Sequence, residues 1–174
     1  MKSLLTKDLL QDLMITAKKN LEKDGSCLPV LHVLANGKVL IFGISVNDLI
    51  DRRKLFSMIG GKVKEDFGGV DEAVFICESW YYKTDKGKPY EAIRPSQHPD
   101  RMEAVMIMGR DKSGKKQKLI MQPFTKVKGK YVYHKKDISG KKGDIAGIMD
   151  YIFNPAEAEL RELSFGMTKP KTKH

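Results

Sequence analysis

The residues of this chain that are best suited to chemistry gather around one predicted strand. Glu78 stands in the run 76–81, where most of its neighbours are apolar or aromatic. A carboxylate buried among such residues is costly unless it is paired. We therefore expect Glu78 to be buried and to have recruited partners from the chain that follows, which offers Arg94, His98, Asp100, Arg101 and Glu103.

Two interpretations of this cluster stay open. A histidine that carries protons, carboxylates that act as base or ligand and an arginine that holds an anion would suit a small hydrolase, for example one with metal-assisted phosphodiester chemistry. The candidate catalytic residues are then Glu78, His98, Asp100, Arg101 and Glu103. The other interpretation is an ion-pair network in which Glu78 meets Arg101 or Arg94, and this structural role is the commoner one for buried charges.

The second chemical feature is an excess of lysine. The net charge is +10, and residues 111–142 alone hold eleven lysines against two aspartates, a balance of +9, so the rest of the chain is close to neutral. A block of one sign repels itself and is typical of contact with a polyanion. Only six of the 32 basic residues are arginine, and none of those six lies in this stretch. Because arginine is favoured for bidentate recognition, the stretch indicates loose contact with phosphates.

Aromatic residues interleave with these lysines, as in proteins that hold single-stranded nucleic acid by phosphate contacts and base stacking. The candidate polyanion-binding residues are Lys112, Lys115, Lys116, Lys118, Lys128, Lys130, Tyr131, Tyr133, Lys135 and Lys136. The alternative is that alternation turns both tyrosines into the core and leaves the lysines as a solvated face that protects edge strands. Between the two classes of function, we expect a non-enzymatic binding or interaction protein that contacts nucleic acid or another polyanion.

Other motifs exclude further classes. Residues 109–116 nearly match a phosphate-binding loop, but Lys116 stands where a hydroxyl is needed and a strand follows in place of a helix, so we expect a hairpin turn. The four histidines lack metal-ligand spacing, and we predict no cofactor. Cys27 and Cys77 stand far apart in apolar surroundings, which favours a reducing, cytoplasmic location, and we predict that Cys77 is a buried, inert thiol. No segment approaches the roughly 20 apolar residues of a membrane helix.

The run 94–104, Arg-Pro-Ser-Gln-His-Pro-Asp-Arg-Met-Glu-Ala, lies downstream of Glu78-Ser79-Trp80. Together these residues resemble a pattern of small prokaryotic proteins of unassigned function. The resemblance implies no activity and no catalytic residue. It indicates only that the loop and the strand belong to one site.

The elements that must position these residues begin with an amphipathic helix over 3–23 that stops at Gly25. Two strands, 28–35 and 38–45, then flank Asn36-Gly37, a pair that favours a type I′ hairpin turn. A second helix follows, capped by Ser45 or Asn47, and we expect it to end near Gly60-Gly61.

The second half of the chain reads as a meander. A strand over 70–82 is apolar in both alternating sets, which is typical of a strand covered on both faces. After a proline-punctuated loop, three strands follow over 102–110, 117–127 and 130–136. A helix through 145–153, capped by Asp144, and a further helix starting at Asn154 complete the chain.

This order of elements predicts a single α+β domain over 1–167, with a basic flexible tail at 168–174. The domain has an antiparallel sheet of about six strands with helices packed on it. Because the middle strands need cover on both faces, either helices lie on both sides or one face meets a second copy, which would make a homo-oligomer through the sheet.

Overall fold

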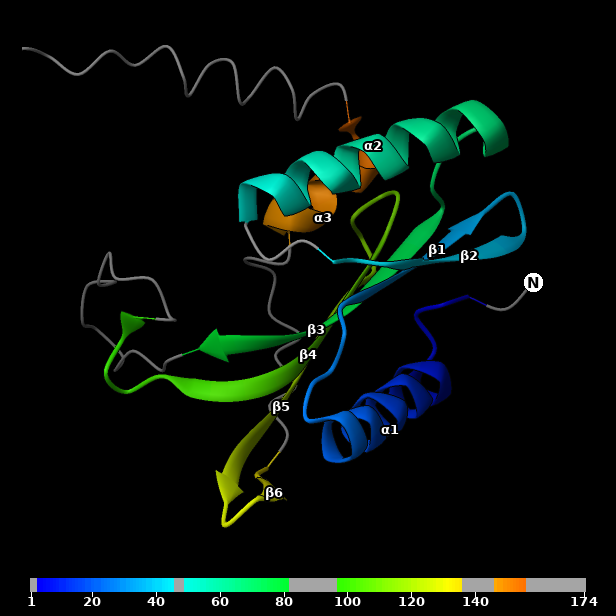
Figure 1. The fold of residues 1–174 in the computed structure, drawn as a ribbon. Helices are drawn as coiled ribbons and strands as arrows, with labels where there is room; N and C mark the ends of the chain where they lie inside the picture. The colour runs from blue at the N-terminus through cyan, green and yellow to red at the C-terminus, as the bar shows by residue number, and fades with distance from the viewer. Residues whose placement is uncertain (1–2, 46–48, 82–96, 136–145, 156–174) are drawn as a thin grey trace, which may run out of the picture.

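A computed structural model of the 174-residue chain describes residues 3–45, 49–81, 97–135 and 146–155 (Figure 1). The six strands of these residues form one antiparallel sheet in the order β2-β1-β3-β4-β5-β6. The predicted α+β fold with a six-stranded antiparallel sheet is confirmed. The elements are α1 (Lys7–Asp24), β1 (Val30–Ala35), β2 (Lys38–Gly43), α2 (Leu49–Phe67), β3 (Glu72–Tyr81), β4 (Met102–Asp111), β5 (Gln117–Val127), β6 (Lys130–Tyr133) and α3 (Ala146–Phe153).

Local signals explain the ends of α1. The helix was predicted to start at Ser3, but it starts at Lys7, because the Thr6 hydroxyl accepts a hydrogen bond from the Leu9 N–H and caps it. The helix ends at Gly25, as predicted, and this glycine adopts the left-handed conformation at φ 74°. Leu4 and Leu5 precede the helix and are nevertheless buried.

The predicted hairpin turn between β1 and β2 is present. Asn36 and Gly37 both adopt positive φ, 45° and 73°, which is the requirement of a type I′ turn. The turn fixes the register, so that Ala35 pairs with Lys38 and Val33 with Leu40.

The predicted end of α2 at Gly60-Gly61 is wrong, because the helix continues to Phe67. A Cβ at Gly60 would lie 2.3 Å from the carbonyl oxygen of Ile152, so this glycine allows α3 to approach α2 closely. The helix stops before Gly68 and Gly69, which both have positive φ. Of its two predicted caps, Asn47 lies outside the described residues.

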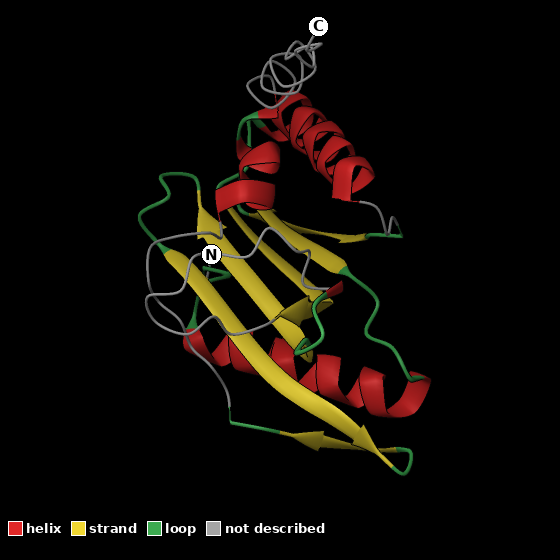
Figure 2. Ribbon diagram, turned by 90° about the vertical axis from the view of Figure 1, so that its left-hand side faces the viewer, coloured by secondary structure: helices red, strands yellow, loops and turns green. Residues whose placement is uncertain are grey.

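Helices cover both faces of the sheet. Figures 1 and 2 show α1 on one face and α2 with α3 on the other. Phe56 of α2 meets Phe75 of β3 edge to face, with ring centroids 5.1 Å apart. On the opposite face Met14 of α1 belongs to one buried cluster with Val74 and Ile107. Residues 72–77 of β3 are buried in succession, which confirms that this part of the strand is covered on both faces.

The rest of the meander follows the prediction, except that β6 ends at Tyr133 and not at 136. Three strands run antiparallel from β4 to β6, and a turn through Gly114 replaces any phosphate loop at 109–116. The predicted cap Asp144 and the tail at 168–174 lie outside the described residues. Among the helices of the described residues, none is long and apolar enough to cross a membrane.

Candidate functional site

Glu78 is not the buried carboxylate that the sequence predicted. Its side chain is exposed, and its carboxylate accepts a hydrogen bond from the Cys27 N–H. The buried run of β3 ends at Cys77. Beyond that point the chain leaving α1 presents its backbone to Glu78. Within the described ranges the Cys27 N–H is the hydrogen-bond partner of this carboxylate, and Arg94, one of its two predicted ion-pair partners, lies outside them.

The buried carboxylate of this strand is Glu72, a residue that the sequence reasoning missed. It is 9% exposed. It accepts hydrogen bonds from the Ser3 hydroxyl, at 2.7 and 2.8 Å to its two oxygens, and from the Leu4 N–H at 2.6 Å. In a strand every second side chain points to the same face, so Glu72 points to the same face as Val74, which packs under α1. This alternation was the only signal in the sequence that Glu72 faces α1.

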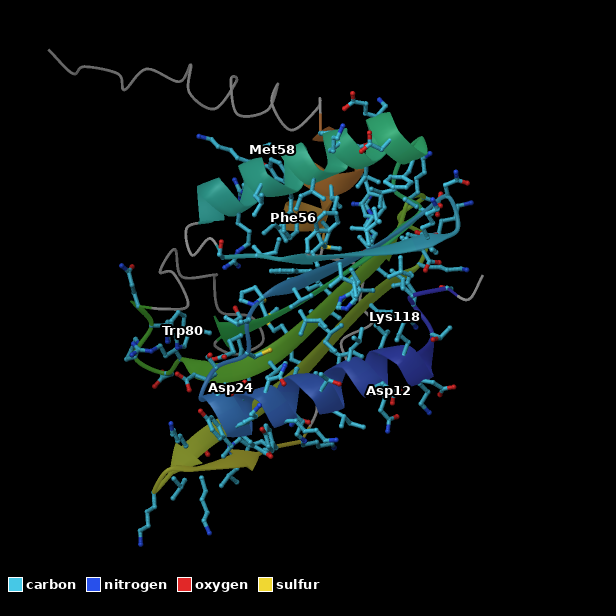
Figure 3. All side chains as sticks on the ribbon, turned by 45° about the vertical axis from the view of Figure 1, so that its right-hand side comes forward. Asp12, Asp24, Phe56, Met58, Trp80 and Lys118 are labelled. Carbon is cyan, nitrogen blue, oxygen red and sulfur yellow. The ribbon has the colours of Figure 1, made fainter. Side chains whose placement is uncertain are left out.

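Two of the five candidate catalytic residues come together. Glu78 and Glu103 line a shallow pocket of about 70 Å³ with Ser79 and Trp80. Trp80 pairs with Glu103 across β3 and β4, and its indole N–H lies 3.4 Å from the Glu103 Oε1. Trp80 is 47% exposed at the end of β3 (Figure 3). The pocket thus holds two carboxylates beside one indole ring.

The other three candidates form a turn outside this pocket. The Asp100 N–H donates to the His98 Nδ1 at 3.1 Å, and the Arg101 N–H donates to the His98 carbonyl at 3.2 Å. His98 is buried, whereas Asp100 and Arg101 are exposed. None of the three lines the pocket with Glu78. In the described ranges no group of His, Cys, Asp and Glu is arranged to hold a metal ion. The predicted constellation therefore divides into a carboxylate pair and a separate turn.

Both cysteines are buried free thiols, as predicted for Cys77. Burial, together with the nearby charge of Glu78, raises the pKa of Cys27 to about 11. Burial raises the pKa of Cys77 to about 12. Because only the thiolate is nucleophilic, both residues are poor nucleophiles at neutral pH.

We expect neither thiol to react promptly with Ellman's reagent in the native protein. With a pKa about three units above a pH near 8, about one Cys27 in a thousand is a thiolate, and the side chain is buried. Absorbance at native conditions should show slow labelling, and both thiols should react at once in urea. Prompt labelling of one thiol per chain in the native state would contradict the burial of Cys27.

The lysine-rich stretch divides into two groups. The turn between β4 and β5 carries the turn group, Lys112, Lys115 and Lys116, and the β5–β6 hairpin carries the hairpin group, Lys126, Lys128 and Lys130. All six side chains are exposed. The ten steps of β5 separate the groups by about 34 Å at an ordinary strand rise. Figure 2 shows β5 running the length of the sheet to the hairpin.

The remaining lysines add to this picture. Lys118 and Lys135 are exposed, whereas Lys136 lies outside the described residues. Lys126, which the candidate list lacked, places its ammonium group 5.1 Å from the centre of the Tyr131 ring. Its position in the hairpin could have been predicted from the strand boundaries.

The two tyrosines of this stretch pack against α1. The Tyr131 hydroxyl donates to the Gly25 carbonyl and the Tyr133 hydroxyl to the Lys18 carbonyl, each at 3.3 Å. The Lys18 ammonium lies 3.9 Å from the centre of the Tyr133 ring. Both side chains are half-buried beside the cluster under α1. This arrangement fits the core interpretation of these residues, in which the rings are engaged by the protein.

Comparisons with known proteins add no assignment to this geometry. Neither the protein-family models, nor the curated proteins, nor the solved structures gave a match to the chain. The site is therefore interpreted from its own residues.

Proposed function

We propose that the protein binds an extended polyanion, nucleic acid or a molecule of similar charge density, through the lysines at the two ends of β5. The observation that carries the proposal is their exposure. Every described lysine between Lys112 and Lys135 is exposed. In the described part of the chain none of them forms an ion pair with a carboxylate. Their charge is thus available to a ligand.

The spacing of the two groups favours a long ligand. A separation of about 34 Å equals about one turn of B-form DNA. A small anion can meet only one group and therefore at most three of these lysines. A polymer that follows β5 can neutralise both groups together, and its affinity rises with each phosphate contact.

The residue types favour contact with the backbone of a nucleic acid and not with its bases. Lysine is a point charge without the planar fork with which arginine reads guanine or grips phosphate. The hydroxyls of Tyr131 and Tyr133 are hydrogen-bonded to α1. Stacking of bases on these rings would require them to leave that contact. We therefore expect binding that depends strongly on salt and weakly on sequence.

The test is a titration of duplexes of different length at increasing salt. The wild-type chain should bind a duplex of about 20 base pairs more tightly than one of about 6, because only the longer one spans both groups. Replacing the hairpin group by glutamine, with Lys126→Gln, Lys128→Gln and Lys130→Gln, should reduce the slope of log affinity against log salt by about 2 to 3. Fluorescence anisotropy measures both quantities.

A matched control removes three exposed lysines elsewhere, with Lys7→Gln, Lys54→Gln and Lys64→Gln, and so lowers the net charge equally. It should leave the slope nearly unchanged. Equal slopes for the two triple variants would contradict the proposal, since binding would then depend on net charge alone. No binding at about 50 mM salt, where phosphate contacts are strongest, would also contradict it.

A further inference from the structure

One edge of β2 pairs with no strand of the described residues, and this free edge lacks the features that normally protect an edge strand. Natural sheets guard their edges with lysines inside the strand, with prolines, with bulges or by keeping the strand very short. β2 has six residues, Lys-Val-Leu-Ile-Phe-Gly, with one charge at its first position and no proline. Val39 is 41% and Ile41 65% exposed. The strand therefore presents apolar side chains to solvent along an unpaired edge.

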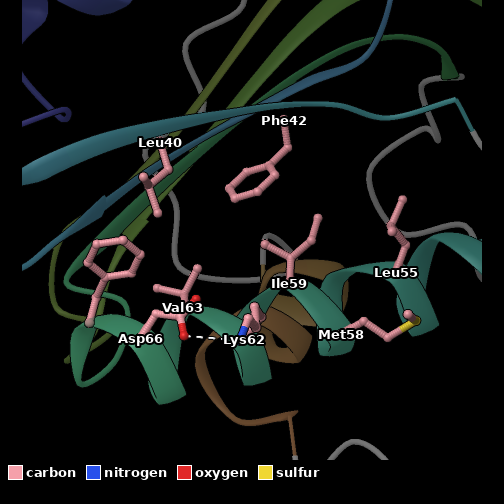
Figure 4. Close-up of a pocket in the computed structure, with 9 residues that line it drawn as sticks. Leu40, Phe42, Leu55, Met58, Ile59, Lys62, Val63 and Asp66 are labelled. Atoms are coloured by element: carbon pink, nitrogen blue, oxygen red, sulfur yellow. Dashed lines mark ion pairs between the residues drawn. The ribbon is translucent and has the colours of Figure 1, made fainter.

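The opposite face of β2 is apolar as well. Leu40 and Phe42 form one wall of a groove of about 400 Å³ whose other wall is α2 (Figure 4). The apolar residues of α2 that line the groove are Leu55, Met58, Ile59, Val63 and Phe67. Met58 is 70% exposed on the outer side of the helix, and the Lys62–Asp66 ion pair lies at the rim. A strand paired at this edge would thus meet apolar side chains of β2 on both faces of the sheet, and α2 would stand beside one of those faces.

The other edge of the sheet differs. β6 has only four residues and begins with Lys130. Exposed Lys128 and Lys135 flank it. This edge is short and charged, as expected of an edge that stays unpaired. The contrast sets β2 apart as the edge that is suited to pairing.

The register shows which backbone groups of β2 are free. In a two-residue hairpin the residues next to the turn, Ala35 and Lys38, exchange both hydrogen bonds, and such pairs alternate along the strands. The Ile44 N–H, which bonds the Pro29 carbonyl at 2.8 Å, continues this pattern. The even-numbered residues of β2 therefore bond to β1, and the N–H and C=O groups of Val39, Ile41 and Gly43 point away from the sheet.

We propose that β2 pairs antiparallel with β2 of a second copy of this chain, about a two-fold axis at Ile41. In this register Ile41 faces Ile41 of the second copy, and Val39 faces Gly43 in both directions. Each of these three residues then donates and accepts a backbone hydrogen bond across the axis. A register centred on Leu40 would leave Gly43 unpaired in both copies. Pairing at Ile41 joins the two sheets into one.

A second copy fits this edge because the edge is complementary to itself. The partner strand must carry apolar residues on both faces, as β2 does. Across the axis Leu40 of one copy lies opposite Phe42 of the other, which extends the groove beside α2, and the isoleucines meet on the α1 face.

The two-fold symmetry also keeps the lysine groups of the two copies far apart. The two β6 strands lie at opposite ends of the joined sheet, about 50 Å apart along it at the usual strand spacing. This exceeds the Debye length of about 8 Å several times over, so the lysine groups of the two copies do not repel strongly.

The sharpest test is a disulfide at the two-fold axis. In the full chain the variant Ile41→Cys places two thiols on directly opposed residues, whose Cα atoms are about 5.5 Å apart, within the range of a disulfide. Mild oxidation should convert most of it to a covalent dimer on a non-reducing gel, since Cys27 and Cys77 are buried and do not compete. Val132→Cys, at an exposed position of β6, is the matched control and should stay monomeric. Equal cross-linking of the two variants would overturn the proposal.

A second measurement does not depend on oxidation. Sedimentation equilibrium of the wild-type chain should show a dimer. Ile41→Lys should raise the dissociation constant of this dimer at least tenfold. Val132→Lys should leave the dissociation constant unchanged. Circular dichroism shows whether each variant is folded. A wild-type chain that stays monomeric at about 100 μM, well above the concentrations at which specific dimers form, would overturn the proposal. Because no polyanion is present, this result is independent of the proposed function.

Discussion

One methyl group added at Gly60 is expected to destabilise the protein by about 2 to 3 kcal/mol. The new Cβ in Gly60→Ala would lie 2.3 Å from the carbonyl oxygen of Ile152 and 2.9 Å from its carbonyl carbon. These are backbone atoms, which cannot rotate away as the end of a side chain can. The helices must separate, and the buried side chains of Met149 and Ile152 lose packing. Thermal unfolding should show a midpoint several degrees below that of the wild type.

The neighbouring glycine provides the control. Gly61 lies in the same helix, and a Cβ there would meet nothing within 4 Å. Gly61→Ala should therefore raise the free energy of unfolding by about 0.5 to 1 kcal/mol, as alanine does in an open helix position. The same substitution at two adjacent glycines is thus expected to lower the free energy of unfolding at Gly60 and to raise it at Gly61. If both stabilised the protein, the close approach of α3 to α2 would not exist in solution.

These two glycines also show where the sequence misleads. A Gly-Gly pair after an apolar helix is the usual sign of an end, and by itself it does not distinguish an end from a site of helix contact. The difference lies in α3, which is about ninety residues away in the chain. The β1–β2 turn was predictable because Asn36-Gly37 determines it locally. The real end of α2, Gly68-Gly69, has the same composition and was overlooked.

In the candidate site, too, the local features were predictable from the sequence and the contacts with distant segments were not. Alternation correctly predicted which residues share a face, including Tyr131 and Tyr133, which both meet α1. It did not predict where along β3 the burial ends, because that depends on where the covering segments lie. On the α1 face Glu72 is covered by the N-terminal segment, whereas Glu78 lies beside the chain that leaves α1. The sequence shows that both carboxylates lie in one strand, but it does not show which segment of the chain covers each of them.

The lysine stretch illustrates how folding changes a charge pattern. In the sequence it is one block, yet β5 carries its lysines to two groups about 34 Å apart, so the charge of each group is lower than that of the block. The proposed dimer would affect the proposed binding of a polyanion. A dimer through β2 would hold a hairpin group at each outer edge, and a long polyanion could engage both. Linking two such groups raises apparent affinity without any new contact, provided that the ligand can span them.

Replacing Glu72 is expected to have the other large effect on stability. In Glu72→Ala the Ser3 hydroxyl and the Leu4 N–H lose their acceptor, and an unsatisfied buried donor costs about 1 to 3 kcal/mol. The N-terminal segment should then detach and expose Leu4 and Leu5, which are 4% and 7% exposed in the native chain. Hydrogen exchange of the Leu4 amide, together with the urea midpoint, measures both consequences.

Two further variants separate the hydrogen bonds of Glu72 from its charge. Glu72→Gln keeps one carbonyl oxygen as an acceptor for the Leu4 N–H, so it should recover a large part of the loss. Glu103→Ala removes a carboxylate at an exposed position of the neighbouring strand, and it should change the urea midpoint little. If Glu72→Ala were as mild as Glu103→Ala, the N-terminal segment would not depend on this acceptor. Equal losses in Glu72→Gln and Glu72→Ala would indicate that the negative charge is required, because a neutral acceptor of nearly the same shape would then be insufficient.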